Sequence, residues 1–184
     1  MKKVLVPLAD GFEEIEAITV IDVLRRAGFS VTVAGLKAGA VTGSRKLAVL
    51  PDAALDAVLA ADYDMVVFPG GQPGTDHLRK DERILGIARK MDEKKKWIGA
   101  ICAAPLVIRD AGIATGCKLT SYPGVEEELK GYVYVRERVV VDGKIVTSRG
   151  PGAAMEFALK LVELLEGPSK AEGLAAQMVV REGA

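Results

Sequence analysis

The stretch WIGAICAAPLVI, residues 97–108, passes from an apolar, β-rich run into a segment with helical character. Pro105 stands just inside that segment, where the first turn of a helix makes no use of the N–H that proline lacks. A strand that leads directly into a helix is the repeating unit of parallel α/β sheets. Residues 97–108 therefore predict one such unit, with Cys102 at the bend between its strand and its helix.

The same alternation runs along most of the chain. Apolar runs typical of strands occupy residues 2–9, 30–36, 64–71, 97–102, 118–122 and 143–150, and helical patterns occupy residues 13–27, 81–94, 103–112, 151–166 and 169–180. This order predicts an α/β fold with a doubly wound, mostly parallel sheet and helices on both faces. YVYVRERVVVDGKIVTS, residues 132–148, predicts a hairpin that turns at Asp142–Gly143 and makes one edge of the sheet mixed.

Length and composition limit the class of protein. The 184 residues fit one compact domain, residues 1–184, whose core needs neither disulfides nor metal. Lys plus Arg and Asp plus Glu both number 25, so the net charge of zero attracts no polyanion, and we expect no nucleic-acid partner. No apolar run suits a signal peptide or a membrane span, which predicts a soluble, cytoplasmic protein without a membrane partner. The cysteines Cys102 and Cys117 and the lone His77 lack metal-type spacing, so we expect no metal site.

Several distinctive residues directly follow predicted strands. They are Asp10 and Gly11, Gly70 and Gly71, Cys102, and Arg149 and Gly150. In open α/β sheets, ligands bind beyond the carboxyl ends of the strands. These residues are therefore expected to gather at one edge of the sheet, around a candidate site.

Glu16 occupies an unusual place in the first predicted helix. At about 100° per residue, it shares an otherwise apolar stripe with Phe12, Val20, Val23 and Ala27. A carboxyl there needs a partner or a raised pKa, which favours a functional role. Glu13 and Glu14 have an ordinary explanation, because acidic residues in a first helical turn meet the positive end of the helix dipole.

Two interpretations of Cys102 follow from its position. The thiol of a nucleophile would point toward amides at a helix N-terminus, which would lower its pKa below the usual value of about 8.5. Alternatively, Cys102 is a small buried side chain of the core, which is the commoner fate of cysteines. A neighbouring protonated Glu16 could donate a hydrogen bond to the thiolate, and the two groups would titrate as a coupled pair. Glu16 is thus a candidate general base or proton relay beside a cysteine nucleophile.

The remaining candidates are weaker on pattern alone. Gly70 and Gly71 allow backbone N–H groups to approach a bound oxygen, and the N–H of Ala103 could supply a second donor of an oxyanion hole. Arg149 could bind a carboxylate or phosphate, or pair with a surface acid. Tyr122, at another strand end, could line the pocket or simply stand in a turn. For Cys117 we favour a structural role, and for His77 a solvated position.

Four stretches together resemble the ThiJ/PfpI superfamily, and more closely its DJ-1 branch. They are LADGFEEIEAITVIDVLRRAGFSVTVAGL at 8–36, FPGGQPG at 68–74, GAICAAP at 99–105 and TSRGPGAAMEFALKLVE at 147–163. The resemblance implies a flavodoxin-like homodimer in which Cys102 is the reactive, oxidisable thiol and Glu16 its acidic partner. It further implies that Gly71 and Ala103 form the oxyanion site. Arg45 and the segment from Ser148 to Pro151 would border the cysteine pocket or the dimer interface.

By the same resemblance, the activity is a cofactor-independent one on α-oxoaldehydes or glycated adducts, of glyoxalase or deglycase type, such as methylglyoxal to lactate. The alternative is a redox-sensing, protective chaperone without turnover that uses the same Cys102. A third interpretation keeps Cys102 and Glu16 as inert core residues. Tyr122 stands where human-type relatives have a histidine, so Glu16 would carry most proton movement. Cysteine peptidase chemistry is disfavoured, because Ala103 replaces the histidine of that branch.

Overall fold

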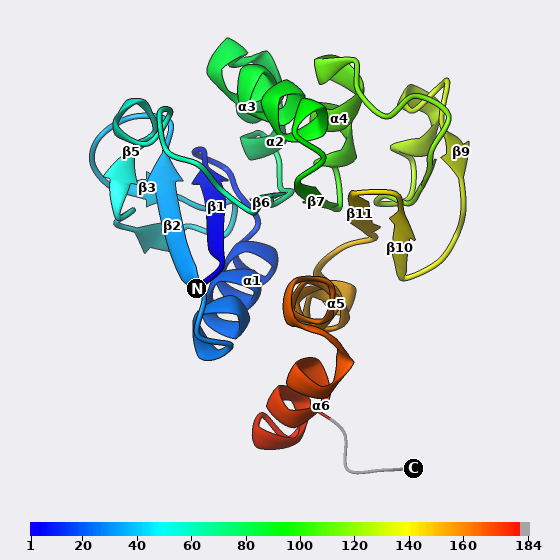
Figure 1. The fold of residues 1–184 in the computed structure, drawn as a ribbon. Coiled ribbons are helices and arrows are strands. Elements are labelled where there is room, and N and C mark those ends of the chain that lie inside the picture. The colour runs from blue at the N-terminus through cyan, green and yellow to red at the C-terminus, as the bar shows by residue number, and fades with distance from the viewer. Residues whose placement is uncertain (181–184) are drawn as a thin grey trace.

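A seven-stranded sheet forms the centre of the molecule in a computed structural model that describes residues 1–180 (Figure 1). In spatial order its strands are β10 (Val139–Asp142), β11 (Ile145–Ser148), β7 (Trp97–Ile101), β6 (Met65–Phe68), β1 (Lys3–Leu8), β2 (Ser30–Gly35) and β5 (Ala53–Ala54). Neighbouring strands are parallel, apart from the antiparallel pair β10 and β11. The predicted mostly parallel sheet with one mixed edge is confirmed.

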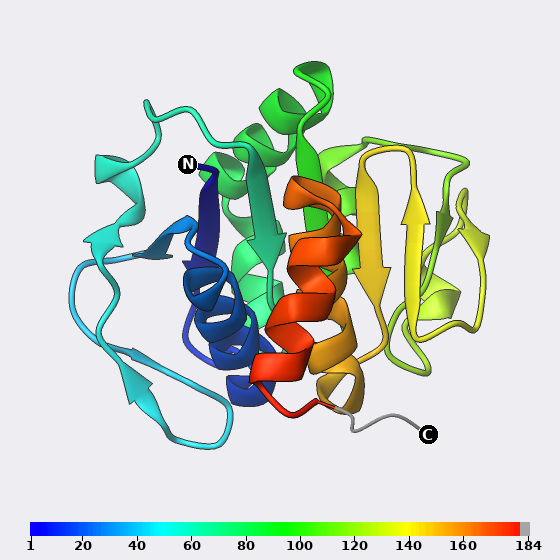
Figure 2. The ribbon, with the colours of Figure 1, turned by 60° about the horizontal axis from the view of Figure 1, so that its bottom comes forward.

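Helices cover both faces of this sheet, as predicted (Figures 1 and 2). One face carries α1 (Glu14–Arg26) and α5 (Ala154–Glu166), with α6 (Pro168–Gln177) packed outside α5. The other face carries α2 (Gly74–Lys80), α3 (Glu82–Glu93) and α4 (Pro105–Ala111). The chain is therefore a three-layer α/β structure. None of the helices described within residues 1–180 has the length and apolar character needed to cross a bilayer.

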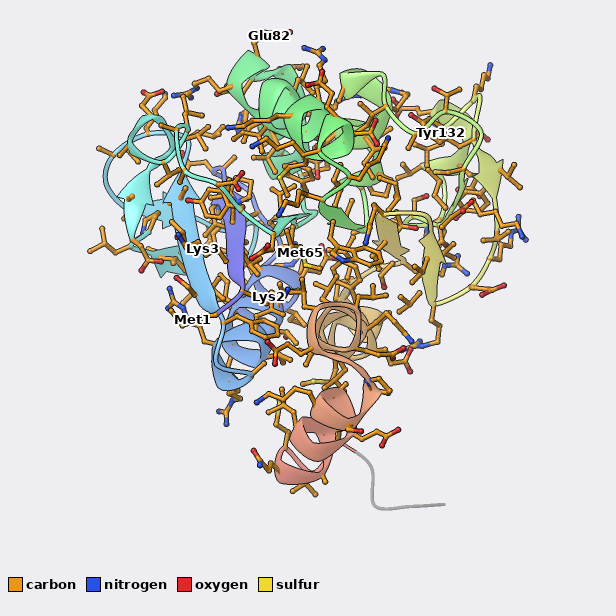
Figure 3. All side chains as sticks on the ribbon, in the orientation of Figure 1. Met1, Lys2, Lys3, Met65, Glu82 and Tyr132 are labelled. Carbon is orange, nitrogen blue, oxygen red and sulfur yellow. The ribbon has the colours of Figure 1, made fainter. Side chains whose placement is uncertain are left out.

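The central strands are apolar along their whole length because both of their faces are covered. In β6, all four residues of MVVF are buried. Met65 and Val67 pack with the α1 and α5 layer, whereas Val66 and Phe68 pack with the α3 and α4 layer. Alternate side chains of a strand point to opposite faces, so one short strand contributes to both halves of the core. Figure 3 shows side chains filling both layers, with Met65 labelled in the interior.

Two small sheets lie outside the main one. β3 (Val41–Thr42) pairs antiparallel with β4 (Ala48–Val49), and β8 (Lys118–Leu119) pairs parallel with β9 (Val133–Tyr134). The strand predicted over 118–122 is therefore only two residues long. The predicted hairpin is confirmed at β10 and β11, where Gly143 adopts a φ of 57°, but Val133–Tyr134 pairs with β8 instead of continuing β10. Three short 3-10 helices complete the described elements, at Leu55–Ala57, Glu126–Glu128 and Pro151–Ala153.

Helix boundaries follow from local capping. Pro105 begins α4, and Gly112 ends it in the left-handed conformation with a φ of 70°. The helix predicted over 81–94 is α3, which begins after Asp81 because that side chain accepts a hydrogen bond from the backbone N–H of Arg83 at 3.0 Å. Helix α2, immediately before it, was not predicted. Its sequence GTDHLRK is short and largely polar, so it carries little helical periodicity.

Candidate active site

Cys102 lies at the sharp bend between β7 and α4. It is a non-glycine residue with a φ of 65°, in the sparsely populated left-handed region. Two backbone hydrogen bonds hold it there: its N–H donates to the carbonyl of Ser148, and its carbonyl accepts from the N–H of Tyr122, both at 2.9 Å. The side chain is buried, with 9% of its surface exposed. The backbone thus stores strain at Cys102, and its neighbours fix the direction of the thiol.

Glu16 lies on the buried face of α1 and is fully inaccessible to solvent. The apolar residues predicted to share its stripe are buried as well, namely Phe12, Val20, Val23 and Ala27. Its Oε2 accepts a hydrogen bond from the backbone N–H of Gly70 at 2.9 Å. Its Oε1 has no hydrogen-bond partner among the residues described, 1–180. One carboxyl oxygen is therefore anchored, and the other is left for the thiol or a bound molecule.

Burial, aided by the charge of Glu13, raises the pKa of Glu16 to about 8. Interaction with the Cys102 thiol and the hydrogen bond from Gly70 both act in the opposite direction and are outweighed. Glu16 consequently keeps its proton through most of the neutral range. A carboxyl with a pKa near the working pH is suited to both giving and taking protons.

The expectation of a lowered thiol pKa is wrong for Cys102. Burial raises the pKa of this thiol, and the charge and hydrogen bonding of Glu16 raise it further. The backbone N–H groups of Gly71 and Ala103 act on the sulfur in the lowering direction but do not prevail. Two buried acidic groups in contact cannot both ionise readily, so the pair releases its first proton as a unit. The raised pKa therefore keeps the Cys102 thiol protonated at rest.

Gly70 fills a place that admits no side chain. A Cβ at this position would lie 2.6 Å from the Cβ of Cys102 and 2.7 Å from Oε2 of Glu16. Its N–H already donates a hydrogen bond to Oε2 of Glu16. The expectation that the N–H of Gly70 is free to bind an oxyanion is therefore wrong. The N–H groups directed at the sulfur are those of Gly71 and Ala103. Gly71 needs its φ of 92°, and a Cβ there would collide with the backbone of Glu13.

Glu13 contributes a link that the sequence did not reveal. Its backbone N–H donates to the carbonyl of Gly70 at 2.9 Å, and its side chain caps α1 by accepting from the N–H of Glu16 at 2.8 Å. The sequence suggested only a favourable interaction with the helix dipole. An acidic residue three positions before Glu16 was the available signal, because a capping side chain bonds an N–H two or three residues further on.

The other predicted pocket residues lie at different distances from the thiol. The hydroxyl of Ser148 donates to the carbonyl of Arg138 at 2.7 Å, so Ser148 meets Cys102 through its backbone. A Cβ at Gly150 would lie 3.3 Å from the ring of Tyr122 and 3.9 Å from Oε1 of Glu16. Tyr122 is 51% exposed and so stands at the mouth of the site.

The side chains of Arg149 and Arg45 make no polar contact with Cys102 or Glu16 in the described part of the chain. Arg149 is half-buried, and its backbone N–H donates to the carbonyl of Arg138 at 3.3 Å. Arg45 is exposed in the loop between β3 and β4, and its backbone N–H donates to Oε1 of Glu14 at 2.5 Å. Neither guanidinium makes a hydrogen bond or salt bridge to Cys102 or Glu16 within residues 1–180.

Cys117 lies away from this cluster, just before β8. It is a free, half-buried cysteine, and burial raises its pKa to about 11. Asp142 and Asp92 add to this shift through their charges. No carboxyl comparable to Glu16 is buried against it among the described residues. Its surroundings agree with the structural role predicted for it.

Comparison with known proteins places this geometry in a family. The DJ-1/PfpI family profile matches residues 2–164. The chain is 46% identical over 182 residues to protein dj-1beta of Drosophila melanogaster, covering 97% of both chains. It is 38% identical over 173 residues to glutathione-independent glyoxalase DJR-1.2 of Caenorhabditis elegans, covering 93% of this chain and 91% of the relative. The crystal structure of Drosophila DJ-1beta superposes with a TM-score of 0.96 at 45% identity, covering 98% of this chain and 99% of that one.

Proposed function

The chain belongs to the DJ-1/PfpI family, and from this membership and the surroundings of Cys102 we propose that it is a cofactor-independent, cysteine-dependent enzyme that converts α-oxoaldehydes such as methylglyoxal to 2-hydroxy acids. The observation that carries the proposal is the contact between a strained cysteine and a fully buried carboxyl whose pKa is raised to about 8. The glyoxalase named among the relatives supports the same reaction class.

The first step is addition of the thiol to the aldehyde carbon. Glu16 in its ionised form takes the proton from Sγ of Cys102, and the sulfur forms a bond to the carbonyl carbon. The carbonyl π electrons move to the oxygen, and we assign the stabilisation of its developing charge to the N–H groups of Gly71 and Ala103, which lie beside the sulfur. Glu16 returns the proton to that oxygen. The product is a hemithioacetal, and the net change is one S–C bond and one O–H bond.

The second step moves hydrogen between adjacent carbons. Glu16 removes the proton from the carbon bonded to sulfur, and the electron pair forms an enediolate with the neighbouring carbonyl. The hydroxyl proton on the sulfur-bearing carbon moves to the oxygen of the neighbouring carbon. Glu16 then returns the carbon-bound proton to that neighbouring carbon, which gives a hydroxyacyl thioester of Cys102. One carbon is oxidised and the other is reduced by the same two electrons, so the step needs no external redox partner.

Hydrolysis completes the reaction. Glu16 takes a proton from water, which attacks the thioester carbon, and the C–S bond breaks to release the hydroxy acid and restore the thiol. We give Tyr122 no part in these transfers, because a phenol is a poor base near neutrality. Early adducts of methylglyoxal with amines or thiols present a similar carbon to Cys102. We therefore include glycated substrates in the proposal.

Conversion of methylglyoxal to lactate by the purified protein tests this function. We expect turnover in the wild-type chain and in Cys117→Ser, and its loss in Cys102→Ser and Glu16→Gln. Buffer and a free thiol at the same concentration correct for spontaneous chemistry. Turnover that survives in Cys102→Ser would overturn the proposal.

A redox-sensing role is the second candidate, and the same N–H groups favour it. A sulfinate on Cys102 would accept hydrogen bonds from Gly71 and Ala103 and from protonated Glu16. Absence of turnover above the controls, together with selective oxidation of Cys102 by peroxide, would replace the enzymatic proposal with this one.

We also propose that the chain is a homodimer, with the exposed face of α1 at its centre. Ile15 is 56% exposed and Ile18 is 37% exposed on that face. Leu47, 52% exposed, adjoins it, because its backbone N–H donates to Glu14 of α1 at 3.4 Å. Sedimentation analysis should find a dimer for the wild-type chain and a monomer for Ile15→Glu. Val133→Glu, at an exposed position of β9 outside the main sheet, should remain dimeric. A monomeric wild-type chain would contradict the proposal.

A further inference from the structure

A cavity opens at the same edge of the sheet as Cys102. It has a volume of about 450 Å³, within the usual range for small-molecule sites. Its walls come from residues 8–10 after β1, from the loop within 36–41 after β2, and from the last turn of α2 with Asp81. Cys102 and Glu16 are not among the lining residues. The cavity is thus separate from the site proposed for catalysis.

The two acidic residues of this cavity are engaged by the protein itself. Oδ1 of Asp10 accepts a hydrogen bond from the backbone N–H of Thr42 at 2.9 Å. Asp81 forms a salt bridge with Arg83 at 2.6 Å and also caps α3. These contacts hold the two carboxylates in structural roles. Because Arg83 pairs with Asp81, only the carboxylate of Asp10 is left to oppose the positive groups of the cavity.

The lysines of the cavity are uncommitted. Lys37 lies in the loop after β2 and Lys80 at the end of α2, and both line the cavity. Neither ammonium group makes a hydrogen bond or a salt bridge with any residue between 1 and 180. Two lysines from different elements that line one concave surface favour an anion as the occupant.

His77 adds a third polar group with a defined orientation. Its Nδ1 lies 2.9 Å from the backbone carbonyl of Asp10. A carbonyl oxygen can only accept, so Nδ1 carries the hydrogen and donates. That bond holds the ring against the cavity wall. Its other nitrogen, Nε2, has no partner within the described part of the chain and remains available to a ligand.

The rest of the lining is apolar and small. Leu8, Ala9, Leu36, Ala38 and Val41 supply it. We propose that this cavity binds a small dianion with an apolar body, of the phosphate monoester class, with the phosphate between Lys37, Lys80 and His77. Phosphate is favoured over carboxylate because three separate polar groups can each reach a different oxygen of a tetrahedral anion. The site does not depend on the reaction at Cys102.

The only histidine of the chain makes a direct binding experiment possible. In proton NMR, the ring signals of His77 need no assignment by mutation. Phenyl phosphate, a dianion with an apolar ring, should shift these signals saturably at fixed pH and ionic strength. Benzyl alcohol, which has the ring without the charge, should leave them in place. Benzoate should bind more weakly than phenyl phosphate.

Substitutions then locate the anion. Lys37→Gln and Lys80→Gln should each raise the dissociation constant by about tenfold, the usual effect of losing one charge-assisted hydrogen bond. Lys130→Gln, an exposed lysine outside the cavity, is the matched control and should bind as the wild-type chain does. Shifts that stay linear without saturation, or equal affinity in all three variants, would overturn the proposal. Tighter binding of benzoate than of phenyl phosphate would overturn the choice of a dianion.

Discussion

The backbone N–H of Gly70 holds Oε2 of Glu16 at 2.9 Å, and a Cβ on Gly70 would intrude between this carboxyl and Cys102. The residue that anchors the proposed base is thus also the one whose missing side chain allows base and thiol to meet. Glu13 holds the other side of the same peptide, since its N–H donates to the carbonyl of Gly70. The loop after β6 therefore sets the geometry of a pair whose two members lie on different elements.

Gly70→Ala should disrupt this pair. The new Cβ would lie 2.6 Å from the Cβ of Cys102, too close for the backbone to remain in place. Overpacking of this kind costs about 1–3 kcal/mol of unfolding free energy, and we expect turnover to fall by at least about 100-fold because the reacting groups shift apart. Urea unfolding and steady-state kinetics measure the two effects. Gly86→Ala is the control, because its Cβ would meet open space on α3 and it should retain full activity.

Glu16→Gln should change how stability depends on pH. Burial raises the pKa of Glu16 to about 8 from an ordinary value of 4.5, so the folded chain keeps a proton that the unfolded chain releases between these values. This contribution to stability is complete below about pH 4.5 and is lost as the pH rises through about 8. The glutamine variant lacks that loss, so wild-type stability should fall relative to the variant between about pH 5 and about pH 9, by ~1.4 kcal/mol per unit of pKa shift at most.

Urea unfolding at several pH values measures this difference. Glu127→Gln, an exposed glutamate, is the control and should follow the wild-type profile. If stability changes with pH in the same way in the wild-type chain and in Glu16→Gln, the pKa of Glu16 is the same in the folded and unfolded states. That result would contradict the raised pKa of Glu16 in the folded chain.

The reactivity of the two cysteines should differ through their neighbours. Cys102 has Glu16 to accept its proton, whereas Cys117 has a pKa raised to about 11 by burial and no such base. Iodoacetamide should therefore modify Cys102 first, at a rate that rises as Glu16 ionises near pH 8. The charge of Glu16 raises the pKa of the thiol, but the same carboxylate takes the proton as the S–C bond forms, so Glu16→Gln should slow this reaction by about 100-fold or more. Peptide mass spectrometry over time distinguishes the two sites, and faster modification of Cys117 would refute the role given to Glu16.

Tyr122→Phe should leave turnover nearly unchanged. Tyr122 stands at the mouth of the site, half exposed, and its ring packs near Gly150. Removing the hydroxyl keeps that packing, so kcat should stay within about threefold of the wild-type value if Glu16 handles the protons alone. Tyr122→Ala, which removes the ring as well, should alter KM more than kcat. A loss of 100-fold or more in Tyr122→Phe would give the phenol a role in proton transfer.

The sequence predicts the fold well because its signals are local. The apolar strands and the proline at the start of α4 carry the main sheet and its helix layers, and the apolar stripe around Glu16 identifies its burial. Helix α2 escapes prediction because GTDHLRK shows little periodicity. The β3–β4 pair is not predicted, because the loop between its strands is held by hydrogen bonds that Glu14, distant in the sequence, accepts from Ser44, Arg45 and Leu47.

The sequence predicts which residues make up the site better than it predicts their pKa values. A cysteine at a helix start suggested a lowered thiol pKa. In the folded chain, burial and the charge of Glu16 outweigh the backbone N–H groups and raise it. The outcome depends on how deeply three separate elements bury two acidic groups against each other, and no local pattern of residues reports that depth.

The two edge strands of the main sheet affect how readily folded molecules aggregate. Unpaired strand edges invite strands from other molecules and so promote aggregation. Here one edge strand, β5, is only two residues long. The other edge strand, β10, ends at Asp142, whose side chain accepts a hydrogen bond from the backbone N–H of Lys118 at 2.8 Å. The apolar strands β1, β6 and β7 each have a hydrogen-bonded strand on both sides. A chain with so apolar a sheet thus offers little template for intermolecular strand addition once it has folded.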